Sequence, residues 1–166
     1  MIQNKQNEQI TKIGNWVATR LNKFESILTF IFLLVMGLKM GTKLNVNVFL
    51  VLTLLTLANL YFLNAFSVHE YASGIEIFLN KIIAICCSAS VIGILFRILH
   101  WAGYEIMLPI SCIALILSLA GILYLKSKKR DGKIFDLRMI IRIVTIVAVG
   151  IIMLLMSNEP LKEAIV

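Results

Sequence analysis

Five long runs of apolar residues, separated by short polar segments, set the pattern of this chain. The runs cover residues 24–40, 46–66, 81–99, 105–125 and 139–156, and they are 17 to 21 residues long. About 20 helical residues cross a hydrocarbon layer of ~30 Å, because each residue adds ~1.5 Å. Each run is therefore predicted to be a transmembrane helix, and the fold class is an all-α integral membrane protein.

The polar segments group these helices into two helical hairpins and a fifth helix. The expected order is a polar N-terminus (1–23), a first transmembrane hairpin (24–66), a cytoplasmic loop (67–80), a second transmembrane hairpin (81–125), a basic cytoplasmic loop (126–138), a fifth transmembrane helix (139–156) and a C-terminal tail (157–166). The loops are too short to hold a soluble domain, so function is expected to lie within the membrane or at its surface.

The N-terminal segment carries an amphipathic pattern ahead of the first apolar run. Its apolar residues recur at helical spacing: Ile10, Ile13, Trp16, Val17, Leu21 and Phe24. Its basic residues, Lys12, Arg20 and Lys23, lie off that stripe. The pattern predicts a separate interfacial helix over 10–24, lying in the lipid headgroup layer with Trp16 as its anchor. Packing of this helix on another soluble element is the alternative, but the chain offers no such element.

Composition agrees with a bilayer environment. Hydrophobic residues make up 60% of the chain, charged residues 15%, and the mean hydropathy is +0.92. The net charge of +7 comes from basic residues that cluster at 5–23 and 126–138, next to apolar runs. Lysine and arginine in that position contact anionic lipid headgroups, so the lipid bilayer is the expected partner and nucleic acid is not.

The basic residues also predict an orientation. With the N-terminus inside the cell, the inside segments hold eleven lysines and arginines and the outside segments hold four. Because cytoplasmic segments are enriched in these residues, we expect a multi-pass protein of the inner (cytoplasmic) membrane. Its N-terminus would be cytoplasmic and its C-terminus outside.

Residues with catalytic chemistry are few and separated. The three cysteines, all inside apolar runs, are Cys86, Cys87 and Cys112. Their spacing fits neither a disulfide framework nor a zinc site, so we expect packing residues. The histidine and glutamates of 67–80 face the cytoplasm in the expected topology, whereas His100 and Glu105 face outward. We therefore predict no catalytic residue, cofactor or metal ligand, and a protein that is not an enzyme.

One motif stands out, at the turn between the third and fourth apolar runs. His100 can meet the terminal carbonyls of the preceding helix, and Arg97 complements its dipole. Trp101 is suited to headgroup depth, and Gly103 permits a positive φ in a tight reversal. Glu105 lies in the first turn of the next helix, where a carboxylate is favoured. These five residues are the predicted hairpin turn and the candidate surface for docking a partner.

This motif resembles the transmembrane hairpin of the gliding-motility L-type membrane proteins, which belong to the type IX secretion motor of Bacteroidota. The resemblance spans residues 81–126, and the matching positions are Gly93, Phe96, Arg97, His100, Trp101, Gly103, Met107 and Leu108. Ala102 stands where the family has proline, and 107–125 lacks the acidic residue that the family uses with the proton gradient. The resemblance implies a membrane hairpin that assembles with copies of itself or with a partner membrane subunit, without the motor function.

Two functions remain in view from the sequence. The first is a small inner-membrane structural or assembly protein, such as a subunit of a gliding-motility or secretion-related complex, and it is favoured by an expected lack of buried charge. The alternative is a small transporter or channel subunit, for which Asn59, Arg97 and Arg142 are the candidate polar groups. Because the predicted spans lack an embedded carboxylate, no proton-driven activity is expected.

Overall fold

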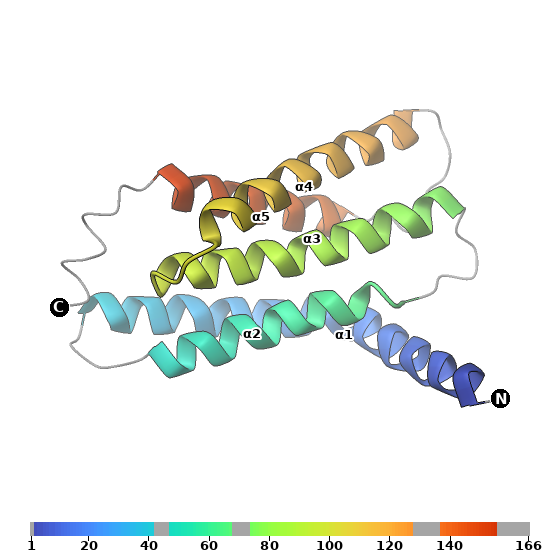
Figure 1. Ribbon diagram of the computed structural model, residues 1–166, viewed down its shortest axis with the longest axis horizontal. Coiled ribbons are helices and arrows are strands. Elements are labelled where there is room, and N and C mark those ends of the chain that lie inside the picture. The colour runs from blue at the N-terminus through green and yellow to red at the C-terminus, as the bar shows by residue number, and fades with distance from the viewer. Residues whose placement is uncertain (1, 42–46, 68–73, 128–136, 156–166) are drawn as a thin grey trace.

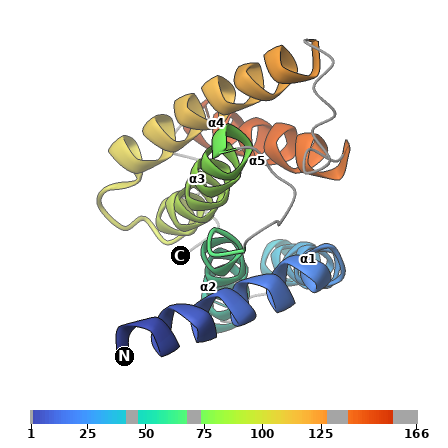
Figure 2. The ribbon, with the colours of Figure 1, turned by 90° about the vertical axis from the view of Figure 1, so that its right-hand side faces the viewer.

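The computed structural model describes residues 2–41, 47–67, 74–127 and 137–155, and these residues form five α-helices. In chain order the helices are α1 (Ile2–Gly41), α2 (Asn47–Asn64), α3 (Gly74–Ile98), α4 (Tyr104–Ser127) and α5 (Leu137–Leu155) (Figure 1). Helix α3 lies at the centre, with α2 on one side and α4 and α5 on the other, and α1 packs against α2 (Figure 2). The all-α prediction is confirmed.

Four of these helices, α2 to α5, are long and apolar enough to cross a membrane. Their outer surfaces carry large apolar side chains, such as Val48 (74% exposed) and Leu155 (78% exposed). Water does not favour so much exposed apolar surface, whereas lipid does. The chain is a small multi-pass membrane protein with four candidate spans.

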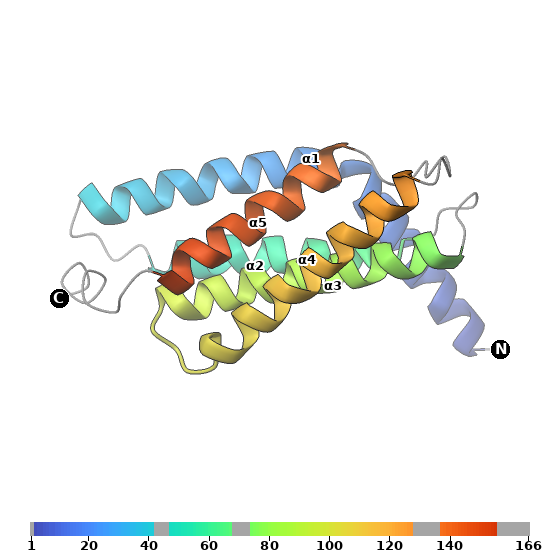
Figure 3. The ribbon, with the colours of Figure 1, turned by 90° about the horizontal axis from the view of Figure 1, so that it is seen from above.

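Helix α1 differs from the prediction. It runs without interruption from Ile2 to Gly41, a length of 40 residues, so the separate interfacial helix over 10–24 is not found. Neither proline nor glycine occurs between Gly14 and Gly37, and nothing in the chain ends the helix near residue 24. The prediction of five transmembrane helices preceded by an interfacial helix is therefore wrong in that form. Figure 3 shows the N-terminal part of α1 leaving the bundle at an angle to the rest.

The central helix is longer than the apolar pattern indicates. Helix α3 begins at Gly74, seven residues before the predicted start at Lys81. Glu76 and Asn80 suggest a polar loop in the sequence, but both are buried, at 8% and 5% exposed. The first turns of α3 therefore contain polar residues, although they pack inside the bundle.

Small residues let α3, α4 and α5 approach closely. A Cβ on Gly93 of α3 would lie 3.1 Å from a leucine of α4, and a Cβ on Gly150 of α5 would lie 2.7 Å from Cys112 Sγ. The Ser90 hydroxyl of α3 donates a hydrogen bond to Ser111 Oγ of α4 at 2.9 Å. Small-residue contacts and interhelical hydrogen bonds of this kind hold helices together in lipid, where no hydrophobic effect drives them together.

Candidate functional site

A charged cluster lies where α1, α2 and α5 converge. Arg142 of α5 donates from Nε to both carboxylate oxygens of Glu25 of α1, at 2.9 and 2.8 Å, and from Nη2 to Glu25 Oε2 at 2.5 Å. Arg142 Nη2 also donates to Asn22 Oδ1 at 3.0 Å. The Tyr61 hydroxyl of α2 donates to Glu25 Oε1 at 2.7 Å. One carboxylate is thus held by two helices other than its own.

The cluster is largely shielded from the surroundings of the bundle. The side chain of Arg142 is 10% exposed and that of Glu25 is 21% exposed. Tyr61 is 3% exposed, and its ring lies 5.4 Å from the Arg142 guanidinium carbon, within cation–π range. Removing either partner of such a pair leaves an uncompensated charge, which is strongly unfavourable in a medium of low dielectric constant.

Helical spacing explains how the cluster is assembled. Asn22 and Glu25 are three residues apart, so they share one face of α1. Arg138 and Arg142 are four residues apart, so they share one face of α5. Helices α1 and α5 run in the same direction (Figure 3), and the hydrogen bonds between Arg142 and Glu25 join these two faces.

A cavity of about 700 Å³ opens beside the cluster, between α1 and α5. Its polar wall is formed by Asn22, Glu25, Ser26, Thr29, Tyr61, Arg138, Arg142 and Thr145. Its apolar wall includes Phe32, Leu54, Leu57, Val91, Ile94 and Ile146. Helices α1 and α5 are not among the closely packed pairs of the bundle, so the ion pair reaches across the cavity between them. Its volume lies in the range of about 300–1,000 Å³ that is typical of sites for small molecules.

The predicted turn is found at the end of α3, and its geometry is more specific than the sequence indicates. His100 has a φ of 55°, in the left-handed region. The Trp101 amide donates to the Phe96 carbonyl at 2.8 Å, and the His100 amide donates to the Arg97 carbonyl at 3.2 Å. This pair of bonds is a Schellman motif, and the Phe96–Trp101 ring contact at 5.4 Å supplies its usual apolar contact. It is the backbone of His100 that ends the helix.

The two charged side chains of the turn, Arg97 and Glu105, have different surroundings. Arg97 is 3% exposed and turns inward, donating from Nε to the Met153 carbonyl in the last turn of α5 at 3.2 Å. Its Nη1 donates to the Tyr104 hydroxyl at 2.5 Å. Glu105 is exposed, and no described residue pairs with it. Arg97 therefore ties α3 to α4 and α5 at a helix C-terminus, where a cation is favoured.

The other two turn residues lie on the surface. Trp101 is 50% exposed. Gly103 has a φ of 101°, as predicted, and its carbonyl accepts bonds from the Ile106 and Met107 amides at the start of α4. The structure thus brings the turn together as a hairpin with a half-exposed tryptophan.

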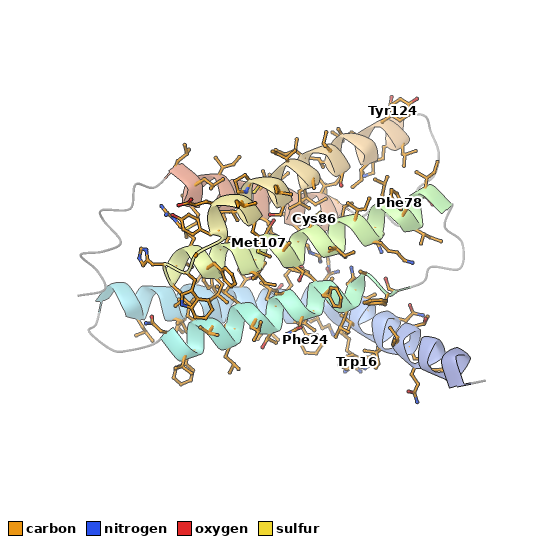
Figure 4. All side chains as sticks on the ribbon, viewed as in Figure 1. Trp16, Phe24, Phe78, Cys86, Met107 and Tyr124 are labelled. Atoms are coloured by element: carbon orange, nitrogen blue, oxygen red, sulfur yellow. The ribbon has the colours of Figure 1, made fainter. Side chains whose placement is uncertain are left out.

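The amphipathic stripe at the N-terminal part of α1 divides into two faces. Val17 and Leu21 are buried against the bundle, whereas Ile13 and Trp16 are each 50% exposed. Trp16 stacks with the Arg20 guanidinium at 5.1 Å and lies on the outer side of α1 (Figure 4). One face of this segment therefore packs on the bundle, and the other face is exposed.

Sequence reasoning missed the charged cluster. Glu25 lies at the start of the first apolar run, so it reads as a boundary residue, and Arg142 reads as a side chain that extends to the nearer membrane surface. The sequence did contain a signal for this cluster: an acidic residue lies inside one apolar run and a basic residue inside another. Because such residues pair when buried, the two runs could have been predicted to meet at an ion pair. The expectation of no buried charge is therefore wrong. Comparison of the chain with protein-family models, curated proteins and solved structures gives no match.

Proposed function

We propose that this protein is a small transporter, or the ligand-binding subunit of one, and that its ligand occupies the cavity between α1 and α5. The observation that carries this proposal is the Glu25–Arg142 ion pair, which lines a cavity of about 700 Å³ within the bundle. Ionisable residues inside membrane segments are rare because they are energetically unfavourable there, and many of them line substrate and ion pathways. The proposal involves binding and movement of a ligand and no catalytic step.

Packing alone accounts less well for the cluster. An ion pair that serves only stability is often replaceable by apolar residues of similar volume without loss, because desolvation offsets its attraction. Here the ion pair bridges α1 and α5 beside a cavity, and the two helices do not pack closely around it. A charged group that borders open space is available to a ligand, whereas one that is enclosed by packed side chains is not.

The proposed setting is the inner membrane, with five crossings. The 40 residues of α1 span ~60 Å, about twice the hydrocarbon thickness, so only part of the helix can lie in the bilayer. We place residues 24–41 across it beside α2, and the N-terminal part at the cytoplasmic surface. There the exposed Ile13 and Trp16 meet the headgroup layer, and the basic residues meet anionic lipid.

An assembly role is the second candidate. It is favoured by the hairpin turn after α3, where Trp101 projects outward from a rigid Schellman motif. The resemblance to the gliding-motility L-type hairpin covers this turn, and it implies contact with copies of the chain or with a partner membrane subunit. In that role the turn would dock a partner at the outer surface of the membrane.

Thiol accessibility separates the two candidates. We expect Thr145→Cys, in the cavity wall, to react with a charged, membrane-impermeant methanethiosulfonate in reconstituted vesicles. The matched control is Ile113→Cys, which lies on the outer face of α4 at 58% exposed and should meet only lipid. Intact mass gives the number of labels, and the wild-type chain with its native cysteines gives the baseline. Equal, slow labelling of both variants would show that water and solutes do not reach the cavity, and would overturn the transport proposal.

A further inference from the structure

We propose that the ligand of the α1–α5 cavity is an amphiphilic anion: an acidic head bound by Arg138 and Arg142, with a single apolar tail against the inner wall. The inference rests on the proposed function and narrows it to a class of ligand. Three features of the cavity point to this class: the charge of its wall, the direction in which polarity changes along it, and the position of Glu25.

The cavity wall carries a net positive charge. Its charged lining residues are Arg138, Arg142 and Glu25, which sum to a formal charge of +1. Arg142 is bound to Glu25, whereas Arg138 is exposed and pairs with no described residue. An anion entering the cavity thus first meets Arg138, a guanidinium that no described residue pairs with, and then Arg142 one helical turn deeper. Guanidinium groups bind carboxylate and phosphate oxygens in two-point geometry, so both chemistries fit the head.

Polarity changes in one direction along the cavity. On α1 the polar lining residues Asn22 and Ser26 come first, and Leu33 lies two turns further on. On α5 Arg138 and Arg142 come first, and Val149 lies two turns beyond. Because the two helices run in the same direction, their polar ends coincide and their apolar ends coincide (Figure 3). A cavity with a charged end and an apolar end fits an amphiphile better than it fits a small inorganic ion.

Glu25 occupies the place of the ligand's head in the empty protein. Its carboxylate accepts hydrogen bonds from Arg142 and from the Tyr61 hydroxyl. Both donors serve equally well for a carboxylate or phosphate that arrives from outside. The ligand therefore competes with Glu25 for Arg142, and this predicts an unusual result: neutralising Glu25 strengthens binding instead of weakening it. The other charged or titratable groups near the Glu25–Arg142 pair are Arg138 of α5 and the thiol of Cys87 of α3.

The test uses a fatty acid with a nitroxide near its chain end, added to the full chain in phosphatidylcholine vesicles. We expect a motionally restricted spectral component above that of protein-free vesicles. Dodecanoate and dodecyl phosphate should displace the label, because they share head charge and tail. Acetate, inorganic phosphate, dodecanol and dodecyltrimethylammonium should not, because each lacks the tail or the negative charge. Displacement by dodecanol or by the cation would overturn the assignment to an anion, and displacement by acetate or inorganic phosphate would show that no tail is required.

Variants then locate the binding site. Arg138→Gln should weaken binding about tenfold, the effect of losing one charge-assisted hydrogen bond, and Arg138→Lys should retain part of it. Arg20→Gln is the matched control, because Arg20 lies outside the cavity over Trp16, and binding should not change. If Arg138→Gln and Arg20→Gln weakened binding equally, the anion would be attracted to the basic surface in general and not to the cavity. Glu25→Gln should bind more tightly, and weaker binding by a folded Glu25→Gln protein would refute the competition.

The outcomes of the two experiments are distinguishable. If Thr145→Cys is labelled and no anion binds, the cavity remains a ligand pathway and the ligand belongs to another class. If neither occurs, both the class and the proposed function are wrong. Should Glu25→Gln fail to fold, Arg138→Gln and Arg138→Lys still decide the proposal, because Arg138 is exposed and makes no described contact that folding requires.

Discussion

Two arginines, the buried Arg97 and the largely shielded Arg142, have different hydrogen-bond partners. Arg142 meets a full negative charge on Glu25, whereas Arg97 meets the dipole of a helix end at the Met153 carbonyl and the hydroxyl of Tyr104. Both arrangements compensate the guanidinium without water, as burial requires. The Arg142 pair borders a cavity, so this arginine is placed to exchange its internal partner for a ligand.

At the same scale, two glycines of α1 are expected to respond oppositely to alanine. A Cβ on Gly14 would lie 2.7 Å from the backbone carbon of Phe66, which cannot move aside as a side chain can. Gly14→Ala should therefore lower the free energy of unfolding by about 1–3 kcal/mol, as overpacking does. Gly37 has nothing within 4 Å of that position, so Gly37→Ala should raise it by up to ~1 kcal/mol through helix propensity. Thermal unfolding in detergent measures both. A Gly14→Ala protein as stable as Gly37→Ala would show that α1 does not press against the end of α2.

At the scale of the element, the turn between α3 and α4 shows what local sequence specifies and what it leaves open. The sequence of the turn predicts a positive φ at Gly103, and the structure confirms it. The target of Arg97 is not readable, because Met153 lies 56 residues away on a helix whose approach depends on the whole bundle. Local rules therefore predicted the backbone of the turn and missed the partner of its most buried side chain.

The turn predicts a ranking of two substitutions. Gly103→Val places a β-branched residue at a φ of 101° and should destabilise the protein by at least about 1–2 kcal/mol. Glu105→Gln removes an exposed charge that pairs with no described residue, so its effect should stay below about 1 kcal/mol, the usual size of a helix-dipole interaction. Thermal unfolding of the two variants in one detergent compares them directly. The reverse order would mean that Glu105 takes part in a charge network that stabilises the hairpin.

At the scale of the whole molecule, the apolar runs were sufficient to predict where helices form. They did not predict how many separate helices the chain has or which helices pack against each other. The five runs each became part of a helix, because a run of this length has no other way to satisfy its backbone in lipid. The N-terminal amphipathic segment merges into α1 because no residue ends the helix near position 24, and Gly14 lets this segment lie close to the backbone at the end of α2. The Glu25–Arg142 pair joins positions 117 residues apart, and no local pattern reports on such a distance. What sequence periodicity could not supply is the set of long-range contacts that creates the candidate site.

Whether the chain crosses the membrane four or five times depends on α1. Helix α2 begins and α5 ends at the same end of the bundle, as four crossings by α2 to α5 require (Figure 1). Helix α1 begins at the opposite end, so the chain termini lie on opposite sides of the membrane only if residues 24–41 also cross it. We expect a reporter fused at Asn7 to be cytoplasmic and one fused at Val166 to be outside. A green fluorescent protein fusion reports the cytoplasm, an alkaline phosphatase fusion reports the outside, and a fusion at Lys129, expected in the cytoplasm, is the control. Cytoplasmic signals at both Asn7 and Val166 would mean that α1 lies along the membrane surface, and the cavity between α1 and α5 would then open outside the hydrocarbon layer.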